Sequence, residues 1–450
     1  SEGSPAAEAG LQAGDIIMEI NGKDMAQGDR TPNELTSYVS DNLRGDPGTT
    51  CVLKLERPTA DSTYIPMELK ITRGTIRTNP VPYYGMVDKN IGYIAISTFA
   101  IEGCSKDIKK ALIELKQQGA TSIVLDLRGN GGGLLSEAVN VVNFFVPKGK
   151  EIVVTKGKIK QAGSTYKTSN EPIDMEIPLT VLVDGATASA AEIVSGSLQD
   201  LDRAVIVGNR TYGKGLVQVP RELPYNSSMK VTTAKYYIPS GRCIQAIDYA
   251  KRNADGSVAR IPDSLTTVFH TAAGREVRDG GGIRPDVEVK AERFPNIMFY
   301  LLNDDMIFDY ATQYCIKHPN IGEVKDFSVT DADYDDFKQM LKKRNFTYDR
   351  QSEKSLKNLK EIAEFEGYME GASEEFAALE KKLTHNLDHE LNRFSKQIRK
   401  AIAEEIVKRH YFQRGVILER MKDDADLTKA IETLKDKEGY TKILSVPADK

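Results

Sequence analysis

The chain has 450 residues, of which 40% are hydrophobic and 28% are charged, and its formal net charge at pH 7 is −4. This length and composition suit two or three globular domains, and the slightly acidic balance gives no reason to expect nucleic-acid binding. No run of about 18 apolar residues predicts a transmembrane helix. The four cysteines lie far apart and lack a CxxC spacing, so we expect neither a metal nor another cofactor.

The first 74 residues predict short strands. Gly14 and Asp15 stand before the segment IIMEINGK, a pattern that is typical of a turn, a strand and a second turn. Further along, CVLKLERP (51–58) alternates apolar and polar residues, as a strand with one buried face does. We therefore expect at least two strands in residues 1–74.

Residues 75–292 predict a domain of a different class. IGYIAISTF (91–99) indicates a strand, and SKDIKKALIELKQQGA (105–120) indicates an amphipathic helix that ends near Gly119. The later runs SIVLDL, IPLTVLVD and RAVIVG are apolar, which suits strands that are buried on both faces of a sheet. Alternation of such strands with helices indicates an α/β domain with βαβ units. The polar, glycine-rich stretch 245–282 predicts a loop.

A glycine-rich turn follows the first of these apolar runs. The segment SIVLDLRGNGGGLLSEAVNVVNFF (122–145) predicts a strand, a turn and a helix, and we expect Asp126 and Arg128 to brace the turn. Backbone N–H groups in such a turn can stabilise an oxyanion, and losing one such donor costs roughly 2.7–4 kcal/mol in a well-studied case. The segment does not match GxxxxGK[ST], which argues against a phosphate-binding loop.

Ser189 occupies a position that suits a nucleophile. It lies in VLVDGATASAAEI (181–193), which predicts a buried strand, a turn and the start of a helix. A strand end is rigid, and a helix N-terminus offers free backbone N–H groups and the positive end of the helix dipole. Serine hydrolases usually use histidine as the base, but none of the five histidines precedes His270.

Lys214 is the obvious alternative base. It stands between two glycines in GNRTYGKGLVQV (208–219), where the backbone can bend sharply. A lysine in water has a pKa of about 10.4, so a lysine base needs an apolar environment that favours the neutral amine. That amine would take the proton of Ser189 and later return a proton to the leaving group. Gln218 follows four residues later, on the same face of an alternating strand, and could hold the amine in place.

Residues 293–450 change to a charged, helical composition. Hydrophobic residues recur every three or four positions from 376 to 406, which predicts an apolar stripe along one helix of about thirty residues. We expect this helix to pack on the preceding domain, on its neighbours or on another subunit, and we see no chemistry in it. The residues of the stripe are Phe376, Leu379, Leu383, Leu387, Leu391, Phe394, Ile398, Ile402 and Ile406.

As a set, these segments resemble one family. The chain is similar to the C-terminal processing peptidases, or tail-specific proteases, which are S41-type serine proteases with a Ser/Lys dyad and a PDZ domain. The matching stretches are GSPAAEAGLQAGDIIMEINGK (3–23), LDLRGNGGG (125–133), TASAAEI (187–193), RTYGKGLVQ (210–218) and GGGIRPDVEV (280–289). The resemblance implies an α/β fold with a ClpP/crotonase-like core. The implied domains are a partial PDZ domain at 1–74, an S41 protease core at 75–292 and a charged helical C-terminal extension at 293–450.

The resemblance also implies a role for individual residues. Ser189 matches the nucleophile, and Lys214 matches the general base. Gln218 matches the residue that orients the lysine. The backbone N–H groups of Gly133 and Ala190 match the donors of the oxyanion hole.

Two features stay open at the level of sequence. Asp200 falls on an acidic position in the helix after the nucleophile, where it either supports the dyad or forms a structural ion pair or helix-end hydrogen bond. In the family, the segment that carries the peptide-binding strand precedes GSPA. We therefore expect most of the PDZ groove to be missing, either by truncation or by clipping.

The expected function is that of a serine endopeptidase that cleaves unfolded or C-terminally tagged or exposed polypeptides. One alternative is a catalytically silent peptide-binding or scaffold protein on the same fold, and a weaker one is a hydrolase of small molecules. Family resemblance points to an exported protein in the periplasm or envelope. The C-terminal helices are candidates for contact with a second copy or with an adaptor.

Overall fold

The structure divides into two units, and each unit combines two separated parts of the chain. The computed structural model describes residues 2–26, 28–61, 63–76, 78–158, 163–225, 227–252, 258–290, 292, 294–348, 350–383 and 386–445. The first unit comprises Ser1–Ile76 with Glu292–Lys422, and the second comprises Arg77–Ala291 with Asp423–Lys450. In these described ranges, no helix has the length and apolar character that crossing a membrane requires.

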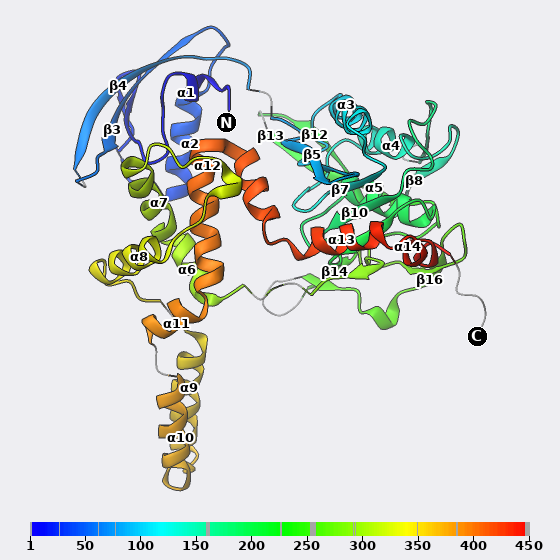
Figure 1. Ribbon diagram of the computed structural model, residues 1–450. Helices are drawn as coiled ribbons and strands as arrows, with labels where there is room; N and C mark the ends of the chain where they lie inside the picture. The colour runs from blue at the N-terminus through cyan, green and yellow to red at the C-terminus, as the bar shows by residue number, and fades with distance from the viewer. Residues whose placement is uncertain are drawn as a thin grey trace. The chain divides into compact units, whose positions relative to one another are not determined.

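The first unit begins with a small antiparallel sheet (Figure 1). Its spatial order is β2-β1-β3-β4. The strands are β1 (Ile16–Ile20), β2 (Lys23–Asp24), β3 (Thr50–Pro58) and β4 (Tyr64–Thr72), and they are accompanied by α1 (Pro5–Glu8) and α2 (Pro32–Leu43). The two strands that the sequence predicts are therefore β1 and β3. Their side chains Ile20 and Leu53 are buried with Ile71 in a small core.

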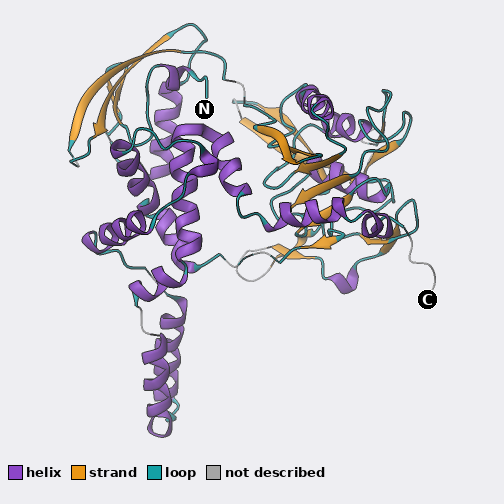
Figure 2. Ribbon diagram, in the orientation of Figure 1, coloured by secondary structure: helices purple, strands orange, loops and turns teal. Residues whose placement is uncertain are grey.

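Helices make up the rest of the first unit (Figure 2). Helices α9 and α10 lie side by side as a hairpin, and α12 packs against α7. The helices are α6 (Asn296–Asn303), α7 (Met306–Lys317), η3 (Val324–Asp326), α8 (Asp331–Lys343), α9 (Gln351–Phe365), α10 (Met369–Leu383), α11 (Leu387–Arg393) and α12 (Ser395–Met421).

The single long helix expected over the apolar stripe is wrong, because the stripe is divided among α10, α11 and α12. Asn386 caps α11: its side-chain oxygen accepts a hydrogen bond from the backbone N–H of His389 at 3.0 Å, and its own backbone is extended. An extended N-cap residue starts a helix and cannot continue a preceding one. Only the later part of the stripe is deeply buried, since Ile398 is 0% exposed whereas Leu379 is 42% exposed.

The second unit is built on a six-stranded sheet in the order β18-β11-β10-β7-β6-β5. All neighbours in this sheet are parallel except β5 and β6, which pair antiparallel. The strands are β5 (Tyr83–Asp88), β6 (Ile91–Ala95), β7 (Ser122–Asp126), β10 (Leu179–Val183), β11 (Val205–Gly208) and β18 (Val287–Glu288). This arrangement confirms the predicted α/β class.

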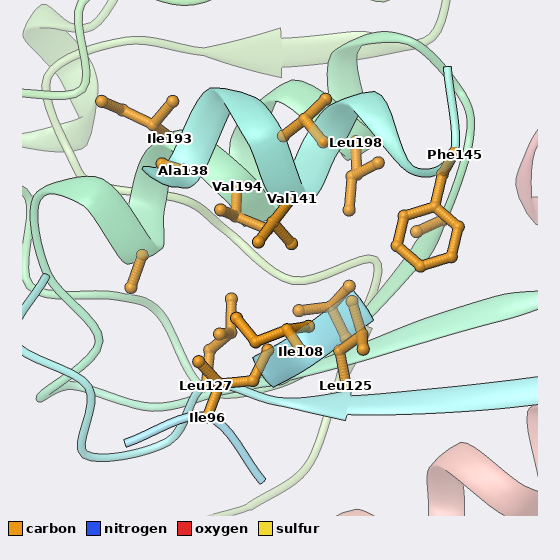
Figure 3. Packing of buried hydrophobic residues seen from close by; sticks show 14 of the residues in the cluster. Ile96, Ile108, Leu125, Leu127, Ala138, Val141, Phe145, Ile193, Val194 and Leu198 are labelled. Carbon is orange, nitrogen blue, oxygen red and sulfur yellow. The ribbon is translucent and has the colours of Figure 1, made fainter. Parts of the chain in front are cut away.

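Three helices cover one face of this sheet. They are α3 (Cys104–Gln117), α4 (Leu135–Asn143) and α5 (Ala190–Asp200). Figure 3 shows Val141 of α4 and Val194 of α5 facing Leu125 and Leu127, and all four side chains are fully buried. Each helix follows a parallel strand, so the turns between strand and helix gather at one edge of the sheet.

The other face of the sheet is covered by a segment from far along the chain. Helix α13 (Ala425–Lys435) contacts β7, β10 and β11, and α14 (Lys437–Ile443) follows it. The Tyr440 hydroxyl accepts a hydrogen bond from the backbone N–H of Leu179 at 2.9 Å and donates one to its carbonyl oxygen at 3.1 Å. The sequence expectation assigns 293–450 to one helical extension. In the structure, the part from residue 423 onward packs within the second unit.

A second, antiparallel sheet stands beside the first in this unit, in the order β12-β13-β8-β9. Its strands are β8 (Glu151–Gly157), β9 (Ser164–Lys167), β12 (Leu216–Leu223) and β13 (Ser227–Tyr237). The stretch 245–282, expected as a loop, contains two short antiparallel strand pairs. These strands are β14 (Ile247–Arg252), β15 (Val258–Arg260), β16 (Val268–His270) and β17 (Glu276–Arg278).

Candidate active site

Ser189 lies between the end of β10 and the first residue of α5. Its backbone has φ 58° and ψ −117°, in a region that residues other than glycine rarely adopt. The preceding turn is fixed by Asp184, whose Oδ1 accepts hydrogen bonds from the backbone N–H groups of Ala186 (3.0 Å) and Thr187 (2.9 Å). The Thr187 hydroxyl donates to the carbonyl of Leu127 at 2.9 Å. These contacts hold the strained conformation in place.

A cavity of about 390 Å³ in the second unit brings most of the predicted site residues together. Ser189, Lys214, Gln218, Gly133 and Ala190 all line it. The remaining lining residues are Ala100, Gly131, Gly132, Leu135, Ile193, Leu216, Val217, Lys230 and Tyr236. Segments far apart in sequence therefore meet around a single space of a size that suits a small group of side chains.

Glu192 connects the Ser189 turn to the Lys214 loop. It is 0% exposed, and its two carboxylate oxygens accept four hydrogen bonds. Oε2 accepts from the backbone N–H groups of Ser189 (2.8 Å) and Lys214 (2.9 Å). Oε1 accepts from the Thr211 hydroxyl (2.5 Å) and from the backbone N–H of Gly213 (2.7 Å). One buried carboxylate thus fixes the backbone of both residues of the predicted dyad.

Two opposing effects act on the charge of this carboxylate. Burial raises the pKa of Glu192, and the hydrogen bonds from Thr211 and the backbone oppose that rise. The Thr211 hydroxyl accepts from the backbone N–H of Ile283 at 2.7 Å, so its own proton is directed at Glu192. All four partners therefore donate, an arrangement that only a carboxylate without a proton satisfies fully.

Sequence reasoning missed Glu192, although the residue lies in the quoted segment TASAAEI. A signal was present, since a glutamate three residues after a serine at a helix start has the spacing of a capping box. The pattern indicates the hydrogen bond to the Ser189 backbone. It contains nothing about Thr211 or Gly213, which lie in another segment.

Tyr236 of β13 supports the Lys214 loop from the neighbouring sheet. Its side chain is 2% exposed, and its hydroxyl donates a hydrogen bond to the carbonyl oxygen of Lys214. Burial raises the pKa of Tyr236 well above its usual value, so the phenol stays protonated and remains a donor. Gly215, which follows Lys214 in the chain, donates its backbone N–H to Gln245 Oε1 at 2.7 Å. The loop is therefore held on several sides.

The glycine-rich turn after β7 is organised by Asn130, which is 0% exposed. Its side-chain oxygen accepts from the backbone N–H of Gly132 at 2.9 Å, and its amide nitrogen donates to the carbonyl of Ile96 at 2.8 Å. Its own carbonyl accepts from the backbone N–H of Ala188 at 2.9 Å. Asn130 therefore joins the glycine turn to the Ser189 turn, a second role that the sequence did not reveal.

Glycine is required in this turn. Gly132 has φ 96°, and a Cβ there would lie 2.8 Å from the backbone nitrogen of Ala190. Gly133 has φ 149°, and a Cβ there would lie 2.1 Å from the backbone nitrogen of Ala100. Within the part of the chain that the structure describes, the backbone N–H groups of Gly133 and Ala190 donate no hydrogen bond. Two free donors thus border the same cavity as Ser189.

Gln218 and Asp200 lie in different surroundings. Gln218 is on β12 at the cavity, and its side-chain amide reaches Thr232 Oγ1 of β13 at 3.4 Å. Asp200 is at the end of α5, away from the cavity, in a fully buried ion pair with Arg242 at 2.8 Å. It also accepts from the backbone N–H of Ser240 at 3.0 Å. Burial raises the pKa of Asp200, and the Arg242 charge opposes that rise.

No group of three or more His, Cys, Asp or Glu side chains in the described ranges is arranged to hold a metal ion. The four cysteines Cys51, Cys104, Cys243 and Cys315 are free thiols. The residues that line the cavity include a serine, two lysines, a glutamine and a tyrosine, and two unpaired backbone donors border it.

Comparison with known families matches three parts of the chain. The model of Peptidase family S41 matches residues 90–251, a PDZ domain model matches residues 1–57, and the model of a probable PDZ-protease C-terminal helical domain matches residues 297–434. The S41 match contains the glycine turn, Ser189 and Lys214.

Individual relatives point in the same direction. The chain is 39% identical over 250 residues to a carboxy-terminal-processing protease of Bartonella bacilliformis, covering 54% of each protein. It is 33% identical over 278 residues to a chloroplastic C-terminal processing peptidase of Tetradesmus obliquus, covering 59% of this chain and 56% of that protein. Among solved structures, a photosystem II D1 C-terminal processing protease has 30% identity and a TM-score of 0.36, covering 65% of this chain and 67% of that one.

The chain spans about half the length of the curated relatives that it matches, 54% in the case of the Bartonella protein. The match to the S41 model, residues 90–251, contains all the residues that line the cavity. By the family models, residues 90–251 are a peptidase family S41 domain that follows a PDZ domain, and by its relatives the chain is similar to the C-terminal processing peptidases.

Proposed function

We propose that this chain is a serine-type endopeptidase that cleaves unfolded or C-terminally exposed polypeptides with Ser189 as nucleophile and Lys214 as general base. The observation that carries the proposal is the shared cavity, which both residues line together with the unpaired N–H groups of Gly133 and Ala190. The names of the relatives support polypeptide cleavage near a C-terminus.

The proposed reaction follows the order of a serine peptidase. Lys214 Nζ takes the proton of Ser189 Oγ while Oγ bonds to the carbonyl carbon of the scissile peptide. The carbonyl oxygen becomes an oxyanion and accepts hydrogen bonds from Gly133 and Ala190. The Lys214 ammonium then gives its proton to the leaving nitrogen, and the C–N bond breaks. Water, deprotonated by Lys214, hydrolyses the Ser189 ester and releases the second fragment.

Gln218 is proposed to orient the amine of Lys214, because Gln218 of β12 and Lys214, two residues before that strand, both line the cavity. Asp200 is proposed as a structural residue, since its carboxylate is used by Arg242 and the Ser240 backbone. These two assignments separate the residues that act at the cavity from one that stabilises the end of α5.

The test is cleavage of an intrinsically unfolded polypeptide by the wild type, Ser189→Ala, Lys214→Met and Lys214→Arg, with a metal chelator present. Methionine keeps the length of the lysine stem without an amine, and arginine keeps the charge but cannot act as a base. We expect each substitution to lower kcat by at least about 10³-fold. Cleavage by Ser189→Ala or Lys214→Met at the wild-type rate would contradict the proposal, whereas chelator-sensitive cleavage would point to a metallopeptidase.

Substrate class and location form part of the same proposal. A PDZ domain captures a peptide end as an added strand, which suits a protease that acts near C-termini. A pair of substrates that differ only in a free or amidated C-terminus tests this, and we expect the free carboxylate to be cleaved faster by a protein whose PDZ groove is complete. Export to the periplasm or envelope is proposed from the family, and fractionation of cells that express the native gene tests it.

A further inference from the structure

Arg128 opens the glycine turn and is surrounded by three carboxylates. Its backbone N–H donates to Asp126 Oδ1 at 2.9 Å, and its Nε lies 3.0 Å from the same oxygen. Its Nη2 lies 2.7 Å from Asp424 Oδ2, and its Nη1 lies 2.9 Å from Asp424 Oδ1 and 3.1 Å from Asp426 Oδ2. The first partner is local, but the other two come from a segment almost 300 positions later.

The contact is largely closed to solvent. The Arg128 side chain is 22% exposed, and that of Asp424 is 8% exposed. A two-pronged contact between an arginine and a carboxylate is directional, so it fixes position as well as charge. The pair is further supported by Tyr93, whose hydroxyl donates to Asp126 Oδ2 at 2.7 Å.

Asp424 also starts α13. Its Oδ1 accepts from the backbone N–H of Leu427 at 3.0 Å, which makes it the N-cap of the helix. The helix is then held against the sheet by buried Leu427 and Leu434 and by an ion pair between Lys435 and Asp88 at 2.6 Å. Asp424 and Asp426, which bind Arg128, therefore lie at the N-terminal end of α13, a helix that packs on the sheet.

A short path joins Arg128 to the oxyanion donors. Arg128 is followed directly by Gly129, whose N–H donates to Asp184 at 3.1 Å, and then by Asn130, which holds Gly132. Gly133, with its unpaired N–H, comes next. A shift of the Arg128 backbone would therefore displace Gly129 and Asn130, whose contacts with Asp184 and Gly132 set the position of Gly133.

We propose that Asp424 and Asp426 position the oxyanion turn through Arg128, so that the segment 423–445 is a working part of the protease site. Arg128 is then a positioning residue that acts on Gly133 through the backbone. This inference rests on the proposed function for its kinetic consequence. Its structural consequence is that the turn at 127–134 becomes more mobile when the two carboxylates are removed. That consequence can be measured without any enzymatic activity.

The experiment compares four versions of this chain: wild type, Asp424→Asn/Asp426→Asn, Asp424→Glu/Asp426→Glu, and Lys435→Met. Asparagine caps a helix as well as aspartate does but carries no charge, whereas glutamate keeps the charge and is a weaker cap. Lys435→Met removes an ion pair from the other end of the same helix and is the control for loosened docking.

Two readouts are taken on each protein. We expect the Asn variant to lose roughly tenfold in kcat with KM little changed, because small displacements of catalytic groups reduce kcat steeply. The peptide covering 127–134 should exchange its backbone hydrogens faster in the Asn variant than in the wild type. The Glu variant should recover most of both properties, and the control should resemble the wild type.

Several outcomes would overturn the inference. Unchanged exchange at 127–134 in the Asn variant would do so even if no protein in the set cleaved a substrate. An equal loss in Lys435→Met would show that docking of α13 matters and the carboxylates do not. An active Asn variant beside an impaired Glu variant would assign the effect to helix capping. If the exchange changes as expected but Ser189→Ala cleaves like the wild type, the proposed function fails while the positioning of the turn stands.

Discussion

Gly133→Ala is the sharpest test of the proposed oxyanion hole. The added Cβ would lie 2.1 Å from the backbone nitrogen of Ala100 and 2.1 Å from the carbonyl carbon of Phe99. Both are backbone atoms of a segment that bridges to Gly133, so neither can rotate away. Because non-bonded heavy atoms need about 3.5 Å, the turn has to move by more than about 1 Å.

A movement of this size takes the Gly133 N–H out of hydrogen-bonding range of the oxyanion. Loss of one such donor raises the barrier by about 2.7–4 kcal/mol, so we expect kcat to fall about 10²–10³-fold. The assay is steady-state cleavage of an unfolded polypeptide, with the melting temperature of each variant measured in parallel so that a folding defect is recognised.

Gly131→Ala is the matched control. Gly131 lines the same cavity two residues earlier, and a Cβ there would meet no atom within 4 Å. We expect this variant to keep the wild-type kcat. A folded Gly133→Ala protein with the same kcat as Gly131→Ala would refute the assignment of Gly133 as an oxyanion donor.

Three further predictions concern titratable groups, of which Glu192 and Asp200 are buried and His410 is half-buried. Glu192→Gln replaces the carboxylate, which accepts hydrogen bonds from four donors, with an amide that can satisfy only some of them. We expect the unfolding free energy to fall by about 1–3 kcal/mol for each unpaired donor and kcat to fall as well. Urea unfolding and the cleavage assay measure the two effects. Asp200→Asn leaves the buried Arg242 charge uncompensated and should cost about 3–5 kcal/mol in unfolding free energy, while kcat per folded molecule is kept; a selective loss of kcat would instead give Asp200 a part at the cavity. Burial lowers the pKa of His410 below its ordinary value of 6.5, so the unfolded chain binds the proton more tightly than the folded one. The unfolding free energy should therefore fall as the pH drops below 6.5. The difference in unfolding free energy between wild type and His410→Gln, measured across pH, isolates this contribution, and a pH-independent difference would contradict it.

The parts of the site that could be predicted from sequence are those with a local signal. Glycines mark the turns around Gly133 and Lys214, and small residues after an apolar strand mark Ser189, so these segments could be selected and expected to meet. Their catalytic roles remain predictions. Glu192 and Asn130 escaped because their importance lies in partners from other segments, such as Thr211 and Ile96, which a single sequence does not place.

The helical region shows the same limit. The apolar spacing from 376 to 406 is correct for a helix, but spacing does not reveal that Asn386 begins a new one. Likewise, α13 carries the amphipathic pattern of any surface helix, with Leu427 and Leu434 on its buried side. Long-range packing decides which sheet the buried side of α13 packs against. The periodicity of the helix contains no information about that partner.

The return of α13 to the sheet has a consequence for the order in which the protein is made. All strands of the six-stranded sheet precede the helical segment 296–421, and α13 follows it. During synthesis the strands therefore emerge long before the helix that covers their second face. Until α13 packs there, the apolar side chains of Val124 and Leu182 are not covered by it. Closing so long a loop is slow. A nascent chain that lacks α13 thus has a half-covered sheet and an Arg128 without Asp424.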